Sequence, residues 1–362
     1  MKIAILGVRG IPVSYGGFEP LAERLALHLV ERGHQVVVYG DKRYIDEDSP
    51  YHGVERINFQ TLRSKALEKL SGAALQALHS SWRAVDVVLM LGLSPIAFAL
   101  LPRLRGCRLV ANVDGLEWKR GKWGLAGRTY LKASERAAVQ LCHTLVADSI
   151  GMQQYYLDEY NAPTVFIPYG ADLEEPQSAD SRVLAELGLA PRNYVLQICR
   201  FEPENNALWS LEEYRSVKRD LPLVIVGDAP YADAYEAKLR AAADERTVFT
   251  GRLSGERLAA LRRNAMIYIH GHEVGGTNPS LLEAMAAGNC VVANDVIFNR
   301  EVLGDAGIAV DRAPGRLAET LTALLDSPEL CRARGEQARA RIESAYNWPA
   351  VLAQYERVLC DV

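Results

Sequence analysis

Residues 270–295 read HGHEVGGTNPSLLEAMAAGNCVVAND and combine the end of a strand, a glycine turn, a helix and a second strand. Pro279 suits the first helical position, where its missing N–H costs nothing. Asn278 or Thr277 would supply the N-cap, and Gly288 would close the helix. The backbone N–H groups at such a helix start attract anions. The stretch therefore predicts an α/β unit with a phosphate-binding turn.

The same alternation of apolar runs and amphipathic stretches continues along the chain. Strands are predicted at 2–6, 35–40, 85–91, 108–113 and 144–149, and then at 195–199, 223–227, 248–251, 266–271 and 290–295. A helix is expected at 18–32, ended by Gly33. Strands alternating with helices form parallel sheets. Two such series predict two doubly wound domains.

A stretch rich in Pro, Gly and charges, residues 165–181, separates the two series. We therefore expect an N-terminal domain at 1–170 and a C-terminal domain at 171–345. The last segment, 346–362, has the pattern of an amphipathic helix and follows the second domain.

The composition is that of a folded globular protein. The chain has 362 residues, of which 49% are hydrophobic and 24% charged, and its 41 basic and 45 acidic residues give a net charge of −4. This balance argues against nucleic-acid binding. Residues 56–136 are nevertheless basic, with 14 Lys or Arg against 5 Asp or Glu, a difference of +9.

Targeting and metal-binding signals are weak. The chain opens directly into a strand, and its longest apolar run, 87–101, is broken by Gly and Pro, so we expect a cytoplasmic protein. The six cysteines form no CxxC pair, and the acidic triplet at 46–48 sits in a polar loop. We expect no metal and no cofactor.

Two further ligand-binding features are expected. Gly16 and Gly17 directly precede the first long helix, and Gly-Gly lets the backbone approach a ligand closely. Glu283 lies one turn into the helix that follows the glycine turn, where a carboxylate can accept hydrogen bonds from ribose hydroxyls. A flexible turn and a solvated glutamate are the alternative interpretations. Asn299 is expected to cap the start of a further helix.

Several motifs together carry a resemblance to a known family. They are SYGGFE, VDGLEWKRGKW (113–123), ADS (147–149), IPYG (167–170), CRFEPENN (199–206), FTGRL (249–253) and GGTNPSLLEAMA (275–286). In this order, over essentially the whole chain, they resemble family-4 glycosyltransferases of GT-B fold. Within that group they look similar to the bacterial rhamnosyltransferases of surface-polysaccharide (lipopolysaccharide) biosynthesis.

The resemblance implies two Rossmann-like domains facing a cleft, with the C-terminal helix crossing back to the N-terminal domain. It implies a retaining transfer from a nucleotide-diphosphate sugar, dTDP-L-rhamnose in that subgroup, without an obligatory metal. Arg200 matches the diphosphate-binding arginine, Glu283 the ribose-binding glutamate, and Gly16 and Gly17 the loop glycines. Asp114 stands where histidine is often found, and we expect it to position the acceptor or stabilise charge.

The donor-binding residues expected on this basis are Gly16, Gly17, Arg200, Glu204, Asn205, Arg252, His272, Gly275, Gly276, Thr277, Asn278, Ser280, Leu281 and Glu283. Arg200, Asp114 and Glu283 are expected to be catalytic.

Three departures from the family pattern bear on specificity. Gly275 replaces a glutamate of the E-x7-E motif, with Glu273 nearby; Asn205 replaces a common lysine; and Asp114 replaces histidine. We interpret them as altered specificity. His270 and His272 flank the strand end, and one of them is expected to touch the donor sugar.

The basic segment after Asp114 predicts a membrane contact. Residues 116–138 interleave tryptophans with basic side chains, among them Trp118, Lys119, Arg120 and Lys122. Aromatic rings suit the headgroup level and basic residues attract anionic lipid. We expect a peripheral contact with the inner face of the plasma membrane that presents a lipid-linked or saccharide acceptor. A solvated helix with packed tryptophans is the alternative.

Other functions remain open on the sequence. The lost glutamate and lysine suit a non-catalytic GT-B-like binding protein, and UDP- or GDP-hexose is an alternative donor. A GT-B epimerase would need no acceptor. A nicotinamide-dependent dehydrogenase is disfavoured because the chain lacks GxGxxG after its first strand.

Overall fold

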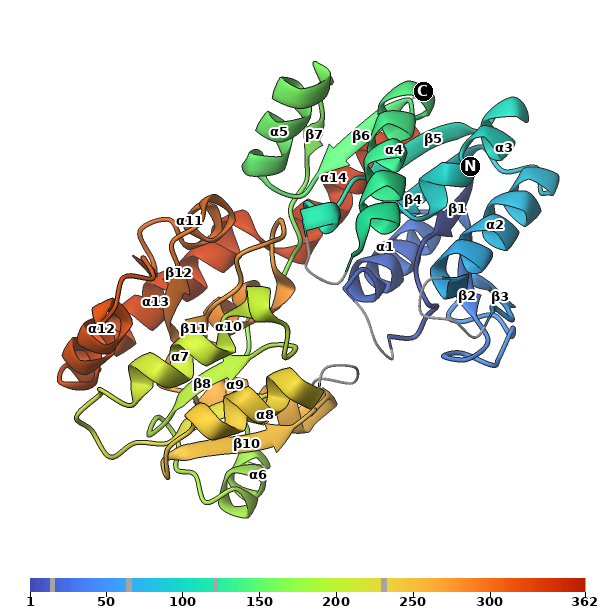
Figure 1. The fold of residues 1–362 in the computed structure, drawn as a ribbon. Helices are drawn as coiled ribbons and strands as arrows, with labels where there is room; N and C mark the ends of the chain where they lie inside the picture. Colours follow the sequence, from blue (N-terminus) through green and yellow to red (C-terminus); the bar gives the residue numbers. More distant parts are fainter. Residues whose placement is uncertain (14–16, 63–66, 120–122, 229–232, 362) are drawn as a thin grey trace. The chain divides into compact units, whose positions relative to one another are not determined.

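The computed structural model describes residues 1–361 except 14–16, 63–66, 120–122 and 229–232. The chain packs as two compact units (Figure 1), one of residues 1–169 with 348–362 and one of residues 170–347. The sequence placed the boundaries at 170/171 and 345/346, close to these positions.

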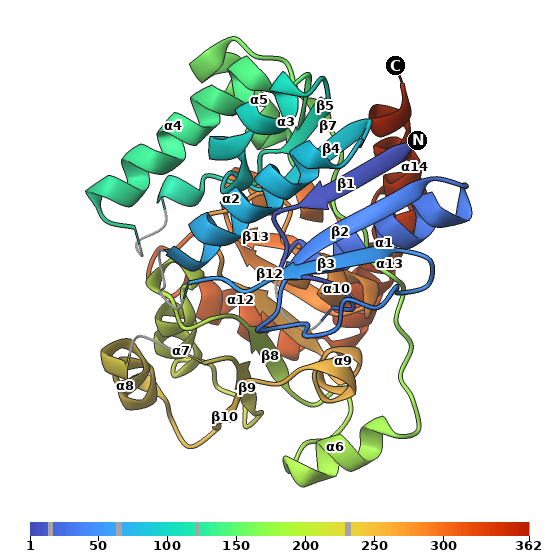
Figure 2. The ribbon, with the colours of Figure 1, turned by 90° about the vertical axis from the view of Figure 1, so that its right-hand side faces the viewer.

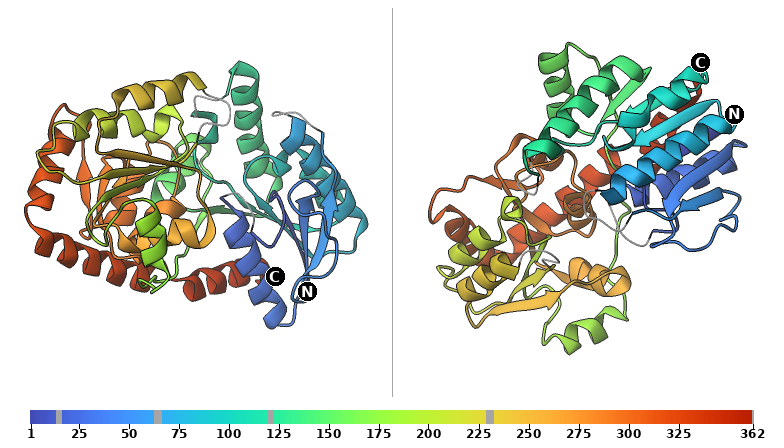
Figure 3. Two further views of the ribbon diagram at one scale, coloured as in Figure 1. Left: turned by 90° about the horizontal axis from the view of Figure 1, so that it is seen from below. Right: turned by 45° about the vertical axis from the view of Figure 1, so that its right-hand side comes forward.

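The first unit is built on a seven-stranded parallel sheet in the order β3-β2-β1-β4-β5-β6-β7. Its strands are β1 Lys2–Leu6, β2 Gln35–Asp41, β3 Glu55–Phe59, β4 Val87–Leu91, β5 Arg108–Asn112, β6 Thr144–Ala147 and β7 Val165–Phe166. The inner strand β4 is buried along its length. Helices cover both faces of this sheet, as its apolar runs require (Figure 3).

The helices of the first unit are α1 Glu19–Glu31, α2 Leu67–Trp82, α3 Leu100–Leu104, α4 Leu125–Leu141, α5 Ile150–Tyr160 and α14 Trp348–Cys360, with short turns η1 Pro95–Phe98 and η2 Glu117–Lys119. Helices α1 and α14 pack together, whereas α2, η1, α3 and α4 adjoin one another over the other face (Figure 2).

The second unit is built on a six-stranded parallel sheet in the order β10-β9-β8-β11-β12-β13. Its strands are β8 Val195–Ile198, β9 Leu223–Val226, β10 Thr247–Gly251, β11 Ile267–His270, β12 Cys290–Asn294 and β13 Ile308–Val310. Its helices are α6 Asp180–Glu186, α7 Ala207–Tyr214, α8 Asp233–Ala242, α9 Gly255–Asn264, α10 Pro279–Ala286, α11 Ile297–Leu303, α12 Arg316–Leu325 and α13 Pro328–Ala345, with η3 Pro203–Asn205.

The ten predicted strands are all present, and the sequence missed β3, β7 and β13. β7 and β13 end their sheets and have two and three residues. β3 is also an edge strand, and its burial alternates along ERINF. Short or half-exposed edge strands lack the continuous apolar run that marks the inner strands.

The C-terminal helix α14 belongs to the first unit. The buried Asn112 at the end of β5 donates a hydrogen bond from Nδ2 to the hydroxyl of Tyr355, at 2.7 Å. At the next residue of α14, the carboxylate of Glu356 lies 2.8 Å from His28 of α1. These contacts tie the last helix to a strand 243 residues earlier and to a helix 328 residues earlier.

Candidate functional site

The strand order of each sheet reverses at one point, between β1 and β4 in the first unit and between β8 and β11 in the second. In open α/β sheets, ligands bind beyond the carboxyl ends of the strands at this point. In the second unit the loops there are residues 199–206 after β8 and 271–278 after β11. We call these two loops the β8–β11 site.

Two hydrogen bonds join the loops of the β8–β11 site. The N–H of Glu273 donates to the carbonyl of Glu204 at 3.0 Å, and Nδ2 of Asn206 donates to the carbonyl of Gly271 at 2.8 Å. The loops approach closely, since a methyl group on Gly271 would lie 2.4 Å from the carbonyl oxygen of Asn205. The fold thus brings together the CRFEPENN and GGTNPS motifs, which lie about seventy residues apart in sequence.

Asn278 caps helix α10, as the sequence allowed. Its Oδ1 accepts the N–H of Ser280 at 3.0 Å and the hydroxyl of Ser280 at 2.9 Å, and Pro279 is the first helical residue. The N–H groups of Leu281 and Leu282 both donate to the carbonyl of Asn278. The prediction that the helix start offers free N–H groups is therefore wrong for this conformation, because the cap already satisfies them.

The glycine turn before α10 is the part that remains accessible. Gly275 has a φ of +152°, and a methyl group there would meet no atom within 4 Å. Gly276 beside it is half-buried, whereas Thr277 is buried. A ligand would meet this turn rather than the first turn of the helix. Glu273, considered as a substitute for the missing glutamate at 275, pairs with Arg312 at 3.2 Å.

Glu283 is held by an arginine from the neighbouring helix. Nη1 of Arg262 lies 2.5 Å from its carboxylate, and the Arg262 side chain is 8% exposed while that of Glu283 is 41% exposed. Arg262 also pairs with Glu174. Burial raises the pKa of the Glu283 carboxyl, and Arg262 partly opposes this. The carboxylate is therefore oriented and still reachable, rather than free in solvent.

Arg200 presents its guanidinium to solvent beside the site. Its side chain is 48% exposed, and Nη2 lies 3.8 Å from the carboxylate of Glu202. Asn205, expected to bind the donor, is instead 4% exposed, and its Nδ2 donates to the carbonyl of Arg200 at 2.8 Å. Asn205 thus holds the backbone that carries Arg200, and in this conformation its side chain offers nothing to a ligand.

The two histidines of the strand end are stacked. Their ring centroids are 4.3 Å apart with the planes 13° from parallel. His270 is fully buried, and neither of its ring nitrogens has a hydrogen-bond partner among the described residues. Burial lowers its pKa to about 3, so the ring is neutral. Only His272, which is partly exposed, is placed to meet a ligand in this conformation.

The remaining expected donor residues lie in three different settings. Glu204 is partly exposed, and its carbonyl already accepts the bond that joins the loops. Leu281 is fully buried. Arg252 is exposed but follows β10, two strands from β8, so its backbone lies about 10 Å from the switch point.

Two residues outside the expected donor-binding set hold the site together. Arg312, just after β13, donates to Oδ1 of Asn206 at 2.8 Å in addition to pairing with Glu273. Asn299 is buried and donates to the carbonyls of His272 and Asn294. The expected capping role of Asn299 is wrong, because α11 begins at Ile297. Arg312 follows the end of β13. Because the sequence did not reveal that strand, it contained no signal that Arg312 lies at the site.

Asp114 lies at the carboxyl edge of the first sheet. It has a φ of +58°, and its N–H donates to Oδ1 of Asn112 at 2.9 Å. Gly17 is exposed, and a methyl group on it would meet no atom within 4 Å. Gly16 lies outside the described residues.

The basic segment is partly ordered by packing. Nζ of Lys132 lies 4.4 Å from the ring centroid of Trp118, and Trp118 is only partly exposed. Lys119 is exposed, whereas Arg120 and Lys122 lie outside the described residues. The alternative of a packed tryptophan therefore holds for Trp118.

The described residues contain no group of three or more His, Cys, Asp and Glu side chains placed to hold a metal ion. No helix among the described residues has both the length and the apolar character that a membrane span needs.

Comparison with known proteins matches two parts of the chain to family models. Residues 192–327 match "Glycosyl transferases group 1", and residues 95–172 match a "Domain of unknown function", DUF1972. The first match contains both loops of the β8–β11 site.

Two curated relatives and one solved structure illustrate the similarity. The chain is 29% identical over 261 residues to 2-deoxystreptamine glucosyltransferase of Streptomyces kanamyceticus, covering 66% of the chain and 63% of that protein. It is 31% identical over 222 residues to phosphatidyl-myo-inositol mannosyltransferase of Mycobacterium leprae, covering 57% and 56%. The chain thus spans less than two thirds of the length of the curated relatives that it matches.

The structure is similar over the full length of both chains to Anabaena HepE in complex with UDP-glucose, with a TM-score of 0.83 and 17% sequence identity. Two Rossmann-like domains in this arrangement of elements make the fold GT-B.

Proposed function

We propose that this chain is a retaining glycosyltransferase that takes a sugar from a nucleotide-diphosphate donor at the β8–β11 site. The observation that carries the proposal is the meeting of the Arg200 loop and the glycine turn at the switch point, with Glu283 oriented one turn into α10. The group 1 family match to residues 192–327 supports it.

The residues have distinct roles in the proposed reaction. The bond between the sugar's anomeric carbon and the phosphate oxygen breaks, and an acceptor oxygen bonds to the same face of the sugar. The leaving diphosphate gains negative charge and takes the acceptor proton. Arg200 stabilises that charge through paired N–H donors. The turn at Gly275–Gly276 adds backbone contacts, and Glu283 accepts hydrogen bonds from the ribose.

The His272 ring and the turn beside it contact the sugar. Asp114, at the carboxyl edge of the first sheet, positions the acceptor. No metal is needed in this scheme, because cationic and backbone donors supply the charge stabilisation.

The proposed donor is dTDP-L-rhamnose, with UDP- or GDP-hexose as the alternative. The motif resemblance supports rhamnose. The names of the relatives, glucosyl- and mannosyltransferase, and the UDP-glucose complex of HepE support the alternative. A thermal-shift screen of sugar nucleotides decides between them. Stabilisation by dTDP species above UDP and GDP species supports rhamnose, and the reverse order assigns another donor.

The proposed acceptor is a lipid-linked sugar or an oligosaccharide of surface-polysaccharide synthesis. A relative named for a phosphatidyl-myo-inositol acceptor supports the lipid-linked form. We keep Lys119, with Arg120 and Lys122, as a proposed electrostatic contact with an anionic membrane at the cytoplasmic face.

The central test is donor turnover by Arg200→Ala and Glu283→Ala. Arg200→Ala should lose transfer and donor hydrolysis, and Glu283→Ala should retain them only at a raised donor concentration, both while staying folded. Arg182→Ala, which changes an exposed arginine of α6, should keep the wild-type activity. A wild-type protein that binds sugar nucleotides without turnover with any acceptor would instead indicate a non-catalytic GT-B-like binding protein.

A further inference from the structure

Helices α2 and α3 carry a concentration of exposed apolar side chains that the proposed reaction does not use. Among the described residues, sixteen large hydrophobic side chains are exposed, and six of them lie on these two helices. They are Leu75 (38% exposed), Leu78 (46%), Trp82 (75%), Leu100 (50%), Leu101 (37%) and Leu104 (74%). The others are spread over the rest of the described chain.

The spacing of these residues places them on one face of each helix. Leu75, Leu78 and Trp82 are three and then four residues apart, so they share one side of α2. Leu101 and Leu104 are three residues apart on α3, and the intervening Pro102 is buried. The pattern is therefore an outward apolar stripe on each helix, not scattered exposure.

The two stripes adjoin. Helices α2 and α3 pack side by side on the same face of the first sheet (Figures 1 and 2). At their ends, the guanidinium of Arg105 lies 5.9 Å from the ring centroid of Trp82. We call these six side chains with Arg105 the α2–α3 face. Monomeric soluble proteins rarely expose a large apolar patch without a partner.

The charge around the α2–α3 face is positive. Residues 67–108 contain Lys69, Arg83, Arg103, Arg105 and Arg108 against two acids, a difference of +3, of which Arg83 is paired with Glu55 of β3 at 2.6 Å. Both acids are engaged elsewhere. Asp86 accepts the N–H of Lys2 at 2.7 Å, and Glu68 accepts the hydroxyl of Tyr44 at 3.0 Å.

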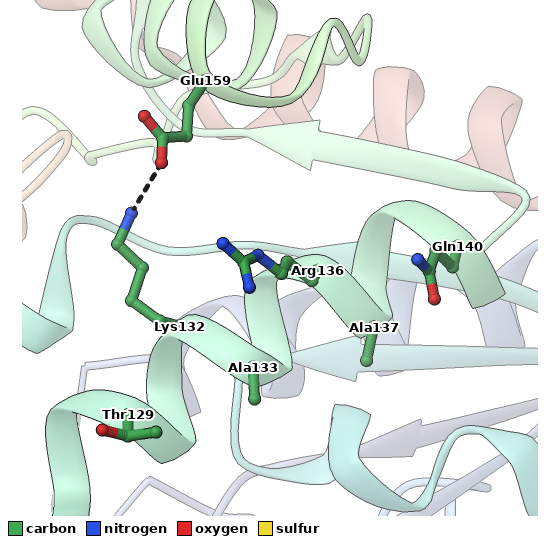
Figure 4. Close-up of a pocket in the computed structure, with 7 residues that line it drawn as sticks. All are labelled: Thr129, Lys132, Ala133, Arg136, Ala137, Gln140 and Glu159. Carbon is green, nitrogen blue, oxygen red and sulfur yellow. Dashed lines mark hydrogen bonds and ion pairs between the residues drawn. The ribbon is translucent and has the colours of Figure 1, made fainter.

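The neighbouring helix α4 extends the positive charge. A hollow of about 520 Å³ beside α4 is lined by Lys132 and Arg136 (Figure 4). Lys132 forms an ion pair with Glu159, with Nζ 3.5 Å from the carboxylate. Arg136 is exposed and forms no ion pair with any residue that the structure describes. Helix α5 carries the acidic residues Asp158 and Glu159, so the positively charged surface ends there.

We propose that the α2–α3 face docks on an anionic lipid bilayer. Trp82 and the leucines would enter the interfacial region, where amphipathic tryptophan is favoured, and Arg105 and Arg136 would meet the lipid phosphates. Stable peripheral attachment requires an apolar anchor together with a basic patch. The basic side chains beside the apolar stripes are complementary to anionic headgroups, so the proposed partner is an anionic bilayer. The surface is separate from Trp118, which is packed against Lys132.

The test is flotation of the full chain with vesicles of phosphatidylcholine, with and without phosphatidylglycerol. We expect binding to the anionic vesicles only. The double variant Trp82→Ser, Leu104→Ser should lose it, and Arg105→Glu should weaken it by roughly fivefold or more. Leu330→Ser, an equally simple change at an exposed leucine of α13, should bind as the wild type does.

Three results would overturn the proposal. They are no binding of the wild type to anionic vesicles, unchanged binding by the double variant, and wild-type self-association that the double variant abolishes without any vesicle binding. The last result would assign the face to a second copy of the chain. Thermal shifts with sugar nucleotides on the same variants keep the two proposals distinct, because the double variant should retain donor-induced stabilisation.

Discussion

Arg262 of α9 lies between two carboxylates, and Nη1 of this nearly buried arginine is 2.5 Å from Glu283 of α10 while the other side of the guanidinium pairs with Glu174. Arg262 therefore fixes the orientation of the Glu283 carboxylate, which we propose binds ribose. Arg262 itself is not among the residues expected to bind the ligand. Arg262 is a positioning residue, and it links the start of the second unit to the site.

Glu283→Ala is expected to raise the donor KM roughly 10- to 100-fold, the range for losing a hydrogen bond to a charged group. Glu283→Gln should have a smaller effect, because its amide oxygen still accepts a bond from ribose. Steady-state kinetics with varied donor measure both. Glu256→Ala removes the exposed partner of Arg263 on the same helix α9 and should leave KM unchanged. Equal KM values for the Glu283 and Glu256 variants would refute the ribose role.

His270 is expected to make the protein acid-sensitive. Its pKa is about 3 in the folded protein against an ordinary value of 6.5, so between these values the unfolded chain binds a proton that the folded chain does not. The stability is fully present above pH 6.5 and is lost as the pH falls toward 3, by up to about 1.4 kcal/mol per pH unit.

Denaturant unfolding at several pH values measures this loss. His270→Phe keeps an aromatic ring against His272 and removes the titration, so the pH slope between 6.5 and 3 should become shallower than in the wild type. Identical slopes for the two proteins would contradict the assignment.

Asp114 has a left-handed backbone conformation and a carboxylate that we propose contacts the acceptor. Two substitutions separate the backbone effect on stability from the carboxylate's effect on activity. Asn tolerates this conformation, so Asp114→Asn should unfold near the wild-type temperature, whereas Asp114→Ala should lose about 1 kcal/mol. Both variants lack the carboxylate and should show reduced transfer with unchanged donor-induced thermal shifts. Full activity of Asp114→Asn would show that the negative charge of Asp114 has no role in the reaction.

Tyr355→Phe tests how α14 is held to the first unit. It removes the hydroxyl that accepts the 2.7 Å bond from Asn112 and leaves a buried amide donor unsatisfied, which costs about 1–3 kcal/mol. Tyr346→Phe is the matched control, because the Tyr346 hydroxyl contacts the carbonyl of Glu301 at a longer 3.4 Å. Chemical denaturation should show the larger loss for Tyr355→Phe, and an equal loss would mean that the bond to Asn112 contributes little.

Asn205→Lys introduces the lysine that the related family commonly has. The position is 4% exposed and its amide holds the carbonyl of Arg200, so a buried ammonium group there should destabilise the protein and weaken donor binding. Melting temperature and donor KM check both effects. An unchanged melting temperature with tighter donor binding would show that the lysine can turn toward the ligand.

The sequence located most of the secondary structure because the inner strands and capped helices carry local signals. The apolar runs of β1, β4, β11 and β12 and the cap at Asn278 are each encoded within a few neighbouring residues. The edge strands β3, β7 and β13 are short or half-exposed, so the same signals were too weak to mark them.

The motifs by themselves also placed Arg200, the glycine turn and Glu283 after the ends of particular strands. Strand ends in parallel sheets share one edge, so motif order and strand order together were enough to predict one nucleotide-sugar site. This prediction depends on chain direction and not on side-chain contacts.

Only the tertiary structure decided which side chains face that site. Asn205 turns inward to Arg200, His270 is buried beneath His272, Arg262 orients Glu283, and Arg312 joins the two loops. The exposed stripe shared by α2 and α3 likewise needs two helices to lie side by side. These features come from contacts between residues distant in sequence, and local spacing does not specify which partners the packed chain brings within hydrogen-bonding distance.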